Sequence, residues 1–202
     1  MITLVDYGLG NIQAFANTYK LLGIECAIAS NVDSLLNASR LVLPGVGAFD
    51  WAMQRLESSG MRPALDDLVL RRHVPVLGIC VGMQMMANRS DEGVTAGLGW
   101  IQGEVKCLNS LKFHSQVRLP HMGWNDITPC EHPLFAGIVD PRFYFLHSYF
   151  FQLDSPDQTL AQAEYGHTFA ASIGSGHILG VQFHPEKSHH WGTQLLLNFA
   201  GF

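Results

Sequence analysis

The sequence contains 202 residues, of which 48% are hydrophobic and 14% are charged, and its formal net charge is −5. This length and apolar content predict one folded domain over residues 1–202 and exclude an intrinsically disordered chain. The modest acidic charge gives no electrostatic basis for a nucleic-acid or membrane surface.

The N-terminal residues form an apolar run that predicts a buried strand. They lack the basic segment and the small-residue cleavage site of a signal peptide. No apolar run approaches the roughly 18 residues that cross a bilayer. We therefore expect a cytoplasmic protein with no membrane-spanning segment.

Apolar runs and amphipathic stretches alternate through the first half of the chain. The predicted strands and helices, in chain order, are strand 2–5, helix 11–22, strand 26–29, strand 40–43, helices 48–56 and 63–72, and strand 75–79. Gly23 is expected to end the first helix, and Pro44-Gly45 the third strand. This alternation predicts a parallel sheet with helices on both faces.

The second half is richer in short β-prone runs, between about residues 99 and 181. The runs expected to form hairpins or to extend the sheet are 100–101, 117–119, 143–146, 170–173 and 178–183. Residues 192–202 predict an amphipathic C-terminal helix. The sequence therefore predicts an α/β fold with a mixed, mainly parallel sheet and added β-hairpins.

Cys80 lies in a G-x-C-x-G turn between strand 75–79 and a helix-like run at 83–88. Such a turn holds a nucleophile in a strained conformation, and Gly78 and Gly82 avoid collisions with neighbouring chain. A helix N-terminus after the turn would favour the thiolate. The alternative is a small buried core cysteine, the role expected for the other three cysteines, which we expect to be free thiols.

A possible base for this nucleophile follows the last apolar run, at His184-Pro185-Glu186. Proline biases His184 toward an extended backbone, in which residues two apart share a face. Glu186 could then fix the imidazole tautomer and stabilise the imidazolium. The alternatives are a satisfied strand-end histidine and a solvated carboxylate.

The remaining histidines are expected to have no catalytic or metal-binding role. His189-His190 lacks companion ligands at metal-site spacing, and no metal site is predicted. The histidines expected to be ordinary surface or satisfied residues are His73, His114, His132, His167 and His177.

Three separated blocks, 44–47, 78–84 and 182–188, resemble those of the class I, triad-type glutamine amidotransferases. Blocks 6–12, 120–125 and 144–149 make the chain most similar, within that family, to the glutaminase subunits of imidazole glycerol phosphate synthases. The resemblance covers essentially the whole chain. It implies a flavodoxin-like fold, L-glutamine as substrate and no cofactor.

The resemblance also implies roles for individual residues. Cys80 would attack the glutamine carboxamide to form a γ-glutamyl thioester, His184 would transfer the proton, and Glu186 would hold His184. The implied oxyanion residues are Gly45, Val46, Gly47 and Val81, and the implied substrate-binding residues are Gln84, Glu92, Ser148 and Tyr149. Val81 departs from the family pattern, which usually has leucine there.

A glutaminase that feeds a synthesis needs an acceptor site, and no part of this sequence resembles a synthase domain. The resemblance implies a heterodimer with a cyclase subunit, as in histidine biosynthesis. The implied interface residues are Asn11, His121, Met122, Trp124, Asn125, Tyr144 and Lys187. Alternatives are a paralogue serving an N-acetyl-sugar amidotransferase, a thiol hydrolase acting alone, and a catalytically silent binding subunit.

Overall fold

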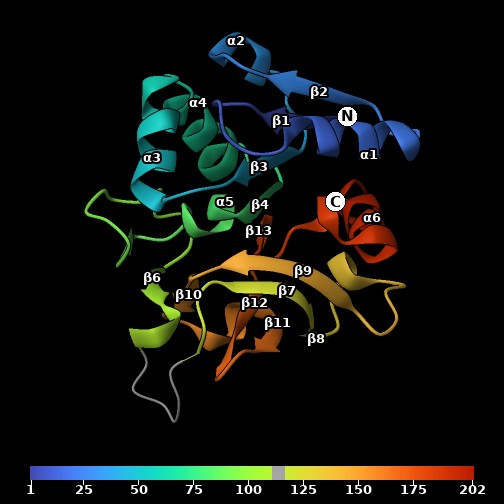
Figure 1. Ribbon diagram of the computed structural model, residues 1–202. Coiled ribbons are helices and arrows are strands. Elements are labelled where there is room, and N and C mark those ends of the chain that lie inside the picture. Colours follow the sequence, from blue (N-terminus) through green and yellow to red (C-terminus); the bar gives the residue numbers. More distant parts are fainter. Residues whose placement is uncertain (111–116) are drawn as a thin grey trace.

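The computed structural model describes residues 1–110 and 117–202. At its centre is an eight-stranded sheet in the order β2-β1-β3-β4-β13-β12-β11-β8 (Figure 1). The first five strands in this order are parallel, and the last three run antiparallel to their neighbours. The strands are β2 (Cys26–Ala29), β1 (Ile2–Val5), β3 (Leu41–Gly45), β4 (Val76–Cys80), β13 (Ile178–Val181), β12 (Thr168–Ser175), β11 (Thr159–Glu164) and β8 (Thr128–Pro129).

Helices cover both faces of the parallel part, which explains why β1, β3, β4 and β13 are buried along their whole length. Helices α1 (Ile12–Leu21) and α6 (His189–Phe199) contact each other on one face. The other face carries α3 (Phe49–Ser58), α4 (Arg62–Asp66) and α5 (Val81–Gln84), with α2 (Val32–Leu35) beside α4. A π-helical turn, η1 (Asp67–Arg71), continues α4.

Two smaller sheets lie beside the main one. One has the order β10 (Tyr149–Leu153), β6 (Gly103–Cys107) and β5 (Arg89–Ser90), and the other pairs β7 (His121–Asp126) with β9 (Arg142–His147). Strand β9 lies beside the segment that follows β13, where the His184 amide donates to the Tyr144 carbonyl of β9 at 2.9 Å (Figure 1). This bond brings the end of β9 next to the chain that leaves the central sheet.

The predicted α/β class with a mixed, mainly parallel sheet is confirmed, and strands 2–5 and 26–29 have the predicted bounds. The third strand ends at Gly45, two residues beyond the predicted bound, because Pro44 and Gly45 also pair with β4. The helix-like run predicted at 83–88 is helical only at Met83 and Gln84. Helix α5 ends at Gln84, and the next backbone hydrogen bonds are of the i→i−3 type. The chain then leaves the helix and bonds the backbone of the Gly97–Ile101 loop.

Two predicted β-runs are irregular in the structure. The segment 100–101 is buried, with the Trp100 indole donating to Asp66 Oδ1 of helix α4 at 2.7 Å. At 117–119 the Val117 backbone bonds the Asn109 side chain, so no strand partner is needed. Cys130 is exposed, so the packing role predicted for it is wrong.

The C-terminal helix begins at His189, three residues before the predicted start. His114 lies outside the described residues. Within the described ranges, no helix is both long enough and apolar enough to span a membrane.

Candidate active site

Cys80 is the last residue of β4 and the N-cap of α5, and its backbone has φ of +54°. Non-glycine residues rarely adopt this region, so the conformation is strained. A Cβ on Gly82 would lie 1.9 Å from the Leu43 carbonyl oxygen, and one on Gly78 would lie 2.8 Å from the Gly82 carbonyl oxygen. Only glycine therefore fits on either side of this sharp strand-to-helix turn.

His184 and Glu186 lie on the segment that follows β13, the strand beside β4. His184 has the extended backbone predicted by the following proline, with φ of −105° and ψ of 95°. The extended strand does not continue to Glu186, because 185–187 form a 3₁₀ turn. The turn nevertheless places Glu186 Oε1 3.0 Å from His184 Nδ1, with both side chains almost fully buried.

The electrostatics of this site favour the imidazolium form of His184. Burial by itself would lower the pKa of His184, but the hydrogen bonds and charges of Cys80 and Glu186 outweigh it and raise the pKa to about 10. Cys80 and His184 line the same pocket, so the two side chains face a common space in which a proton can pass between them. The arrangement can therefore hold a thiolate next to an imidazolium.

Ser188 fixes the backbone of His184 from behind. Its hydroxyl donates to the His184 carbonyl at 2.6 Å and accepts from the Tyr144 amide at 3.0 Å. Ser188 is fully buried. Although residue 188 closes one of the three blocks that carry the resemblance, its sequence pattern gave no indication of this bracing role.

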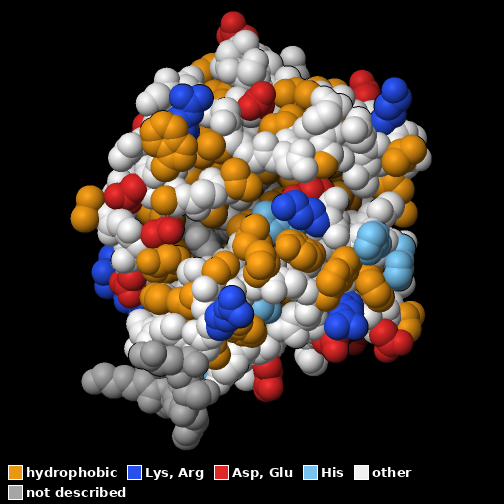
Figure 2. Space-filling view, viewed as in Figure 1, with side chains coloured by type: hydrophobic (Ala, Val, Ile, Leu, Met, Phe, Trp, Pro, Cys, Tyr) orange, Lys and Arg blue, Asp and Glu red, His pale blue; other side chains and the backbone are white. Residues whose placement is uncertain are grey.

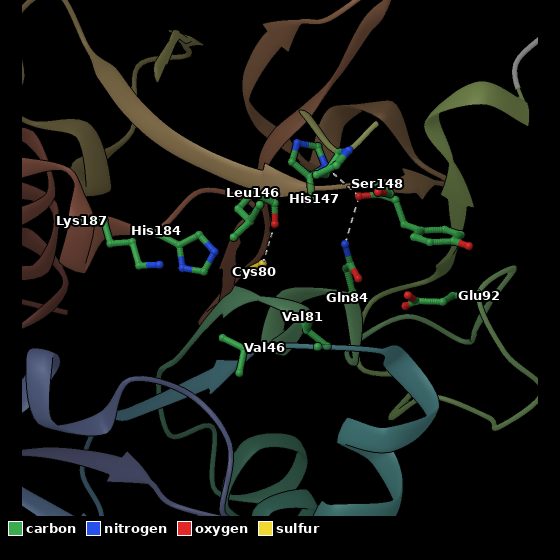
Figure 3. A pocket seen from close by; sticks show the side chains of 13 residues that line it. Val46, Cys80, Val81, Gln84, Glu92, Leu146, His147, Ser148, His184 and Lys187 are labelled. Carbon is green, nitrogen blue, oxygen red and sulfur yellow. Dashed lines mark hydrogen bonds between the residues drawn. The ribbon is translucent and has the colours of Figure 1, made fainter. Parts of the chain in front are cut away.

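Cys80 and His184 open into a pocket of about 350 Å³, which fits a small polar ligand. Figure 3 shows His184 on one side of Cys80 and, on the other, Gln84 followed by Glu92. Val46, Gly47 and Val81 also line this pocket. Gly45 lies behind them, where a Cβ would be 2.4 Å from the Gly82 amide nitrogen.

All four predicted substrate-binding residues, Gln84, Glu92, Ser148 and Tyr149, line the same pocket. The Gln84 amide donates to the Tyr149 carbonyl at 3.0 Å and to Gln182 Oε1 at 2.9 Å, so it is held in one orientation. Glu92 Oε2 accepts from the backbone amide of Phe49, the first residue of α3, at 2.9 Å.

Sequence reasoning missed Asp50, which holds the loop that carries Glu92. Its carboxylate accepts from the backbone amides of Val94 and Thr95, both at 3.0 Å. These hydrogen bonds lower the pKa of Asp50. Nothing in the spacing of Asp50 and this loop along the sequence indicates that they meet.

Residues 3–200 match the protein family described as "Glutamine amidotransferase class-I". The chain belongs to the class I glutamine amidotransferases. The resemblance seen in the three sequence blocks is thereby confirmed.

This amidotransferase has close relatives over its whole length. It is 55% identical over 202 residues to "Imidazole glycerol phosphate synthase subunit HisH" of Bdellovibrio bacteriovorus, with 99% of each chain covered. It is 45% identical to the protein of the same name from Leptospira interrogans, again with 99% of each chain covered.

Among solved structures, a "Crystal structure of glutamine amidotransferase" aligns with a TM-score of 0.76, at 19% identity, over 100% of this chain and 99% of that one. The "Structure of PurLQS from Thermotoga maritima" contains a chain that aligns with a TM-score of 0.72, at 14% identity, over 98% and 96%. At these identities the structures support the fold alone.

The predicted interface residues of the amidotransferase fall into two groups. Met122 and Trp124 are 64% and 37% exposed on one face of β7, and Figure 2 shows apolar side chains gathered over β7 and β9. Tyr144 lies beside Trp124, with ring centroids 6.1 Å apart, and the Lys187 ammonium is 5.8 Å from the Tyr144 ring. Asn11 is exposed at the start of α1.

The second group is His121 and Asn125, which point to the opposite face of the same strand because side chains alternate along it. His121 is only 3% exposed. Its side chain is therefore hidden within this chain, and its place at a partner interface stays a prediction. The Asn125 amide donates inward to the Glu164 carbonyl at 2.8 Å.

Proposed function

We propose that this amidotransferase is the glutaminase subunit of an imidazole glycerol phosphate synthase. In this role the single domain of residues 1–202 hydrolyses L-glutamine to glutamate and delivers ammonia to a cyclase subunit in the cytoplasm. The observation that carries the proposal is that Cys80 and His184 line one pocket while Glu186 bonds the Nδ1 atom of His184. It is supported by the full-length identity of 55% to a synthase subunit of that name.

The first half-reaction forms a thioester. The Cys80 sulfur attacks the carboxamide carbon, and the negative charge moves to the carbonyl oxygen. As the carbon–nitrogen bond breaks, the His184 imidazolium donates its Nε2 proton to the leaving nitrogen, which departs as ammonia. Glu186 keeps His184 in the tautomer that points Nε2 at the reacting atoms.

The second half-reaction hydrolyses the thioester. Water attacks the carbonyl carbon while neutral His184 accepts the proton, and the carbon–sulfur bond breaks to release glutamate and the thiolate. Backbone amides near Val46 and Val81 are assigned to the oxyanion in both steps. Both residues line the pocket beside the sulfur.

The far end of the pocket is assigned to the amino-acid end of glutamine. The Glu92 carboxylate can pair with the ammonium group, and the polar backbone around Ser148 and Tyr149 can bond the remaining groups. Helix α3 and Asp50 fix the position of Glu92 and its loop. A fixed carboxylate binds the ammonium without first losing side-chain entropy.

The partner is assigned to the face that carries Met122, Trp124, Tyr144 and Lys187. Exposed aromatic and methionine side chains are typical of interface centres. The need for a partner follows from the product, because bulk water at neutral pH would protonate ammonia and remove its nucleophilic lone pair. A covered passage from the pocket into a second active site prevents that loss.

The proposal is tested by measuring glutamine hydrolysis under three conditions. These are the full chain alone, the chain with a cyclase subunit carrying its substrate, and the chain with an N-acetyl-sugar amidotransferase. Imidazole glycerol phosphate formed from glutamine only in the cyclase mixture is the expected result. Product formation only with the sugar enzyme would assign the chain to that pathway instead. Cys80→Ala should abolish glutamine use while added ammonium still supports the cyclase.

A further inference from the structure

Two buried histidines outside the proposed triad contact each other at the wall of the pocket. His121 of β7 and His147 of β9 are directly opposite in the antiparallel ribbon. His121 Nδ1 lies 2.9 Å from His147 Nε2. His121 is 3% exposed and His147 is 6% exposed. Two buried imidazoles at this distance form a hydrogen bond whose direction can be worked out.

The donor and acceptor of this bond follow from the Tyr149 carbonyl, which lies 2.8 Å from His147 Nδ1. A carbonyl oxygen only accepts, so Nδ1 of His147 carries the proton. Burial lowers the pKa of His147 to about 3 and that of His121 to about 4, so both rings are neutral at physiological pH. A neutral imidazole has one N–H, and therefore His147 Nε2 accepts from His121 Nδ1.

At the Asn125 end of this series of hydrogen bonds, the contacts agree with the same assignment of donors and acceptors. Nε2 of His121 must accept, and it lies 3.4 Å from the amide nitrogen of Asn125. That nitrogen also donates to the Glu164 carbonyl at 2.8 Å, while the Asn125 oxygen accepts from the Asp126 amide at 2.9 Å. Every polar atom of the chain from Asn125 to Tyr149 thus has one possible role.

The inner end lies in the glutamine pocket. The Tyr149 carbonyl that accepts from His147 also accepts from Gln84, and Figure 3 shows both dashed lines converging on this oxygen. Gln84 in turn donates to Gln182, whose amide lies 3.7 Å from the Cys80 sulfur. His147 itself lines this pocket, so the pair forms part of the wall and holds the Tyr149 carbonyl within it.

Simple packing or metal binding does not account for both rings. The His121 ring stacks between those of Phe145 and Tyr165, at centroid distances of 4.8 and 4.1 Å. A phenylalanine would fill that space without burying two polar nitrogens, which are costly unless bonded. Across residues 1–110 and 117–202, no third His, Cys, Asp or Glu completes a metal-binding group.

We propose that His121 and His147 are a positioning pair, two neutral histidines both protonated on Nδ1, that holds the Tyr149 carbonyl and the adjoining wall in place for glutamine. The pair touches no reacting atom, and it deepens the glutaminase function proposed above, on which it rests. Because β7 carries His121 on one face and Met122 and Trp124 on the other, the pair also links the pocket to the face assigned to the cyclase.

Substitutions at His121 separate hydrogen bonding from packing. His121→Phe keeps the stacked ring but removes the N–H, whereas His121→Asn keeps an N–H near the position of Nδ1. At saturating cyclase subunit, His121→Phe should raise the KM for glutamine roughly tenfold, equivalent to about 1.4 kcal/mol. The kcat should stay within about threefold, and His121→Asn should recover most of the KM.

Two outcomes would overturn the proposal. One is an unchanged KM in His121→Phe with only a lower melting temperature, which would leave the pair a packing element. The other is an equal KM defect in His121→Phe and His121→Asn, which would show that the N–H is irrelevant.

A second measurement does not depend on glutaminase activity. The ¹⁵N imidazole NMR spectrum of the full chain should report both rings as neutral Nδ1–H tautomers between about pH 5 and pH 8. An Nε2–H tautomer at His147 would refute the pair. If the tautomers are as expected but no cyclase elicits glutamine hydrolysis, the proposed function fails while the hydrogen-bond assignment stands.

Discussion

Glu186→Gln tests how much of the proposed chemistry depends on the charge beside His184. Raising the pKa of a histidine from 6.5 to about 10 corresponds to about 5 kcal/mol of preference for the imidazolium. A hydrogen bond to a charged group contributes about 1.5–3 kcal/mol, so we assign about 2 kcal/mol to the bond between Glu186 and His184. Solvent screens the pair little, because the two side chains are 4% and 2% exposed.

A loss of about 2 kcal/mol predicts a kcat for glutamine hydrolysis about 30-fold lower in the complex with the cyclase. This is a lower limit, because an amide at residue 186 can also select the wrong tautomer of His184. Steady-state glutamate release at saturating glutamine is the assay. Glu131→Gln, at an exposed position distant from the pocket, is the matched control and should leave kcat unchanged.

The same substitution has a pH signature in stability. Because the folded pKa of His184 is raised, its stabilising effect is complete below about pH 6.5 and is lost as the pH rises through about 10. The difference in melting temperature between wild type and Glu186→Gln should therefore be larger at about pH 6 than at about pH 10. A kcat within threefold of wild type, or a stability difference that grows with pH, would refute the reasoning.

Three further substitutions test other parts of the structure. Gly82→Ala would place a methyl group 1.9 Å from the Leu43 carbonyl oxygen, and we expect the free energy of unfolding in urea to fall by about 3 kcal/mol. Ser188→Ala removes the hydroxyl that bonds the His184 carbonyl, so stability should fall by about 2 kcal/mol and kcat should fall with it. Trp124→Ala should weaken binding of the cyclase about 30-fold, measured by titration calorimetry, because large exposed aromatics anchor interfaces.

Each of these has a control at a less constrained site. In Gly201→Ala the added Cβ would lie no closer than 3.2 Å to any neighbouring atom. Ser39→Ala removes one exposed hydrogen bond. Both substitutions should change the free energy of unfolding by less than about 0.5 kcal/mol. Trp51→Ala removes a tryptophan that is 52% exposed on α3 and should not alter cyclase affinity. Equal effects of the test and control substitutions would contradict the corresponding assignment.

Local patterns in the sequence were sufficient for the parts of the site that depend on local geometry. The glycines around Cys80 predicted the strained turn, since only residues without Cβ atoms fit there. Pro185 predicted the extended backbone of His184 through a clash that involves adjacent residues alone. Alternating apolar and amphipathic runs predicted the α/β class, because each element must bury its apolar face.

Contacts between distant segments required the tertiary structure. The parallel register of β13 on β4, with Gly180 opposite Gly78, is what brings His184 to Cys80. A one-residue shift would turn every side chain of the strand to the other face. No local pattern encodes that register.

The same reason explains the wrong prediction at residues 100–101 and the burial of His121. Their apolar or polar character was visible in the sequence, but burial depends on which surface lies opposite. For residues 100–101 that surface is a helix, and for His121 it is the interior of the β7–β9 ribbon. Composition and spacing therefore determined the elements and the reactive residues, whereas the packing of remote strands decided which side chains meet.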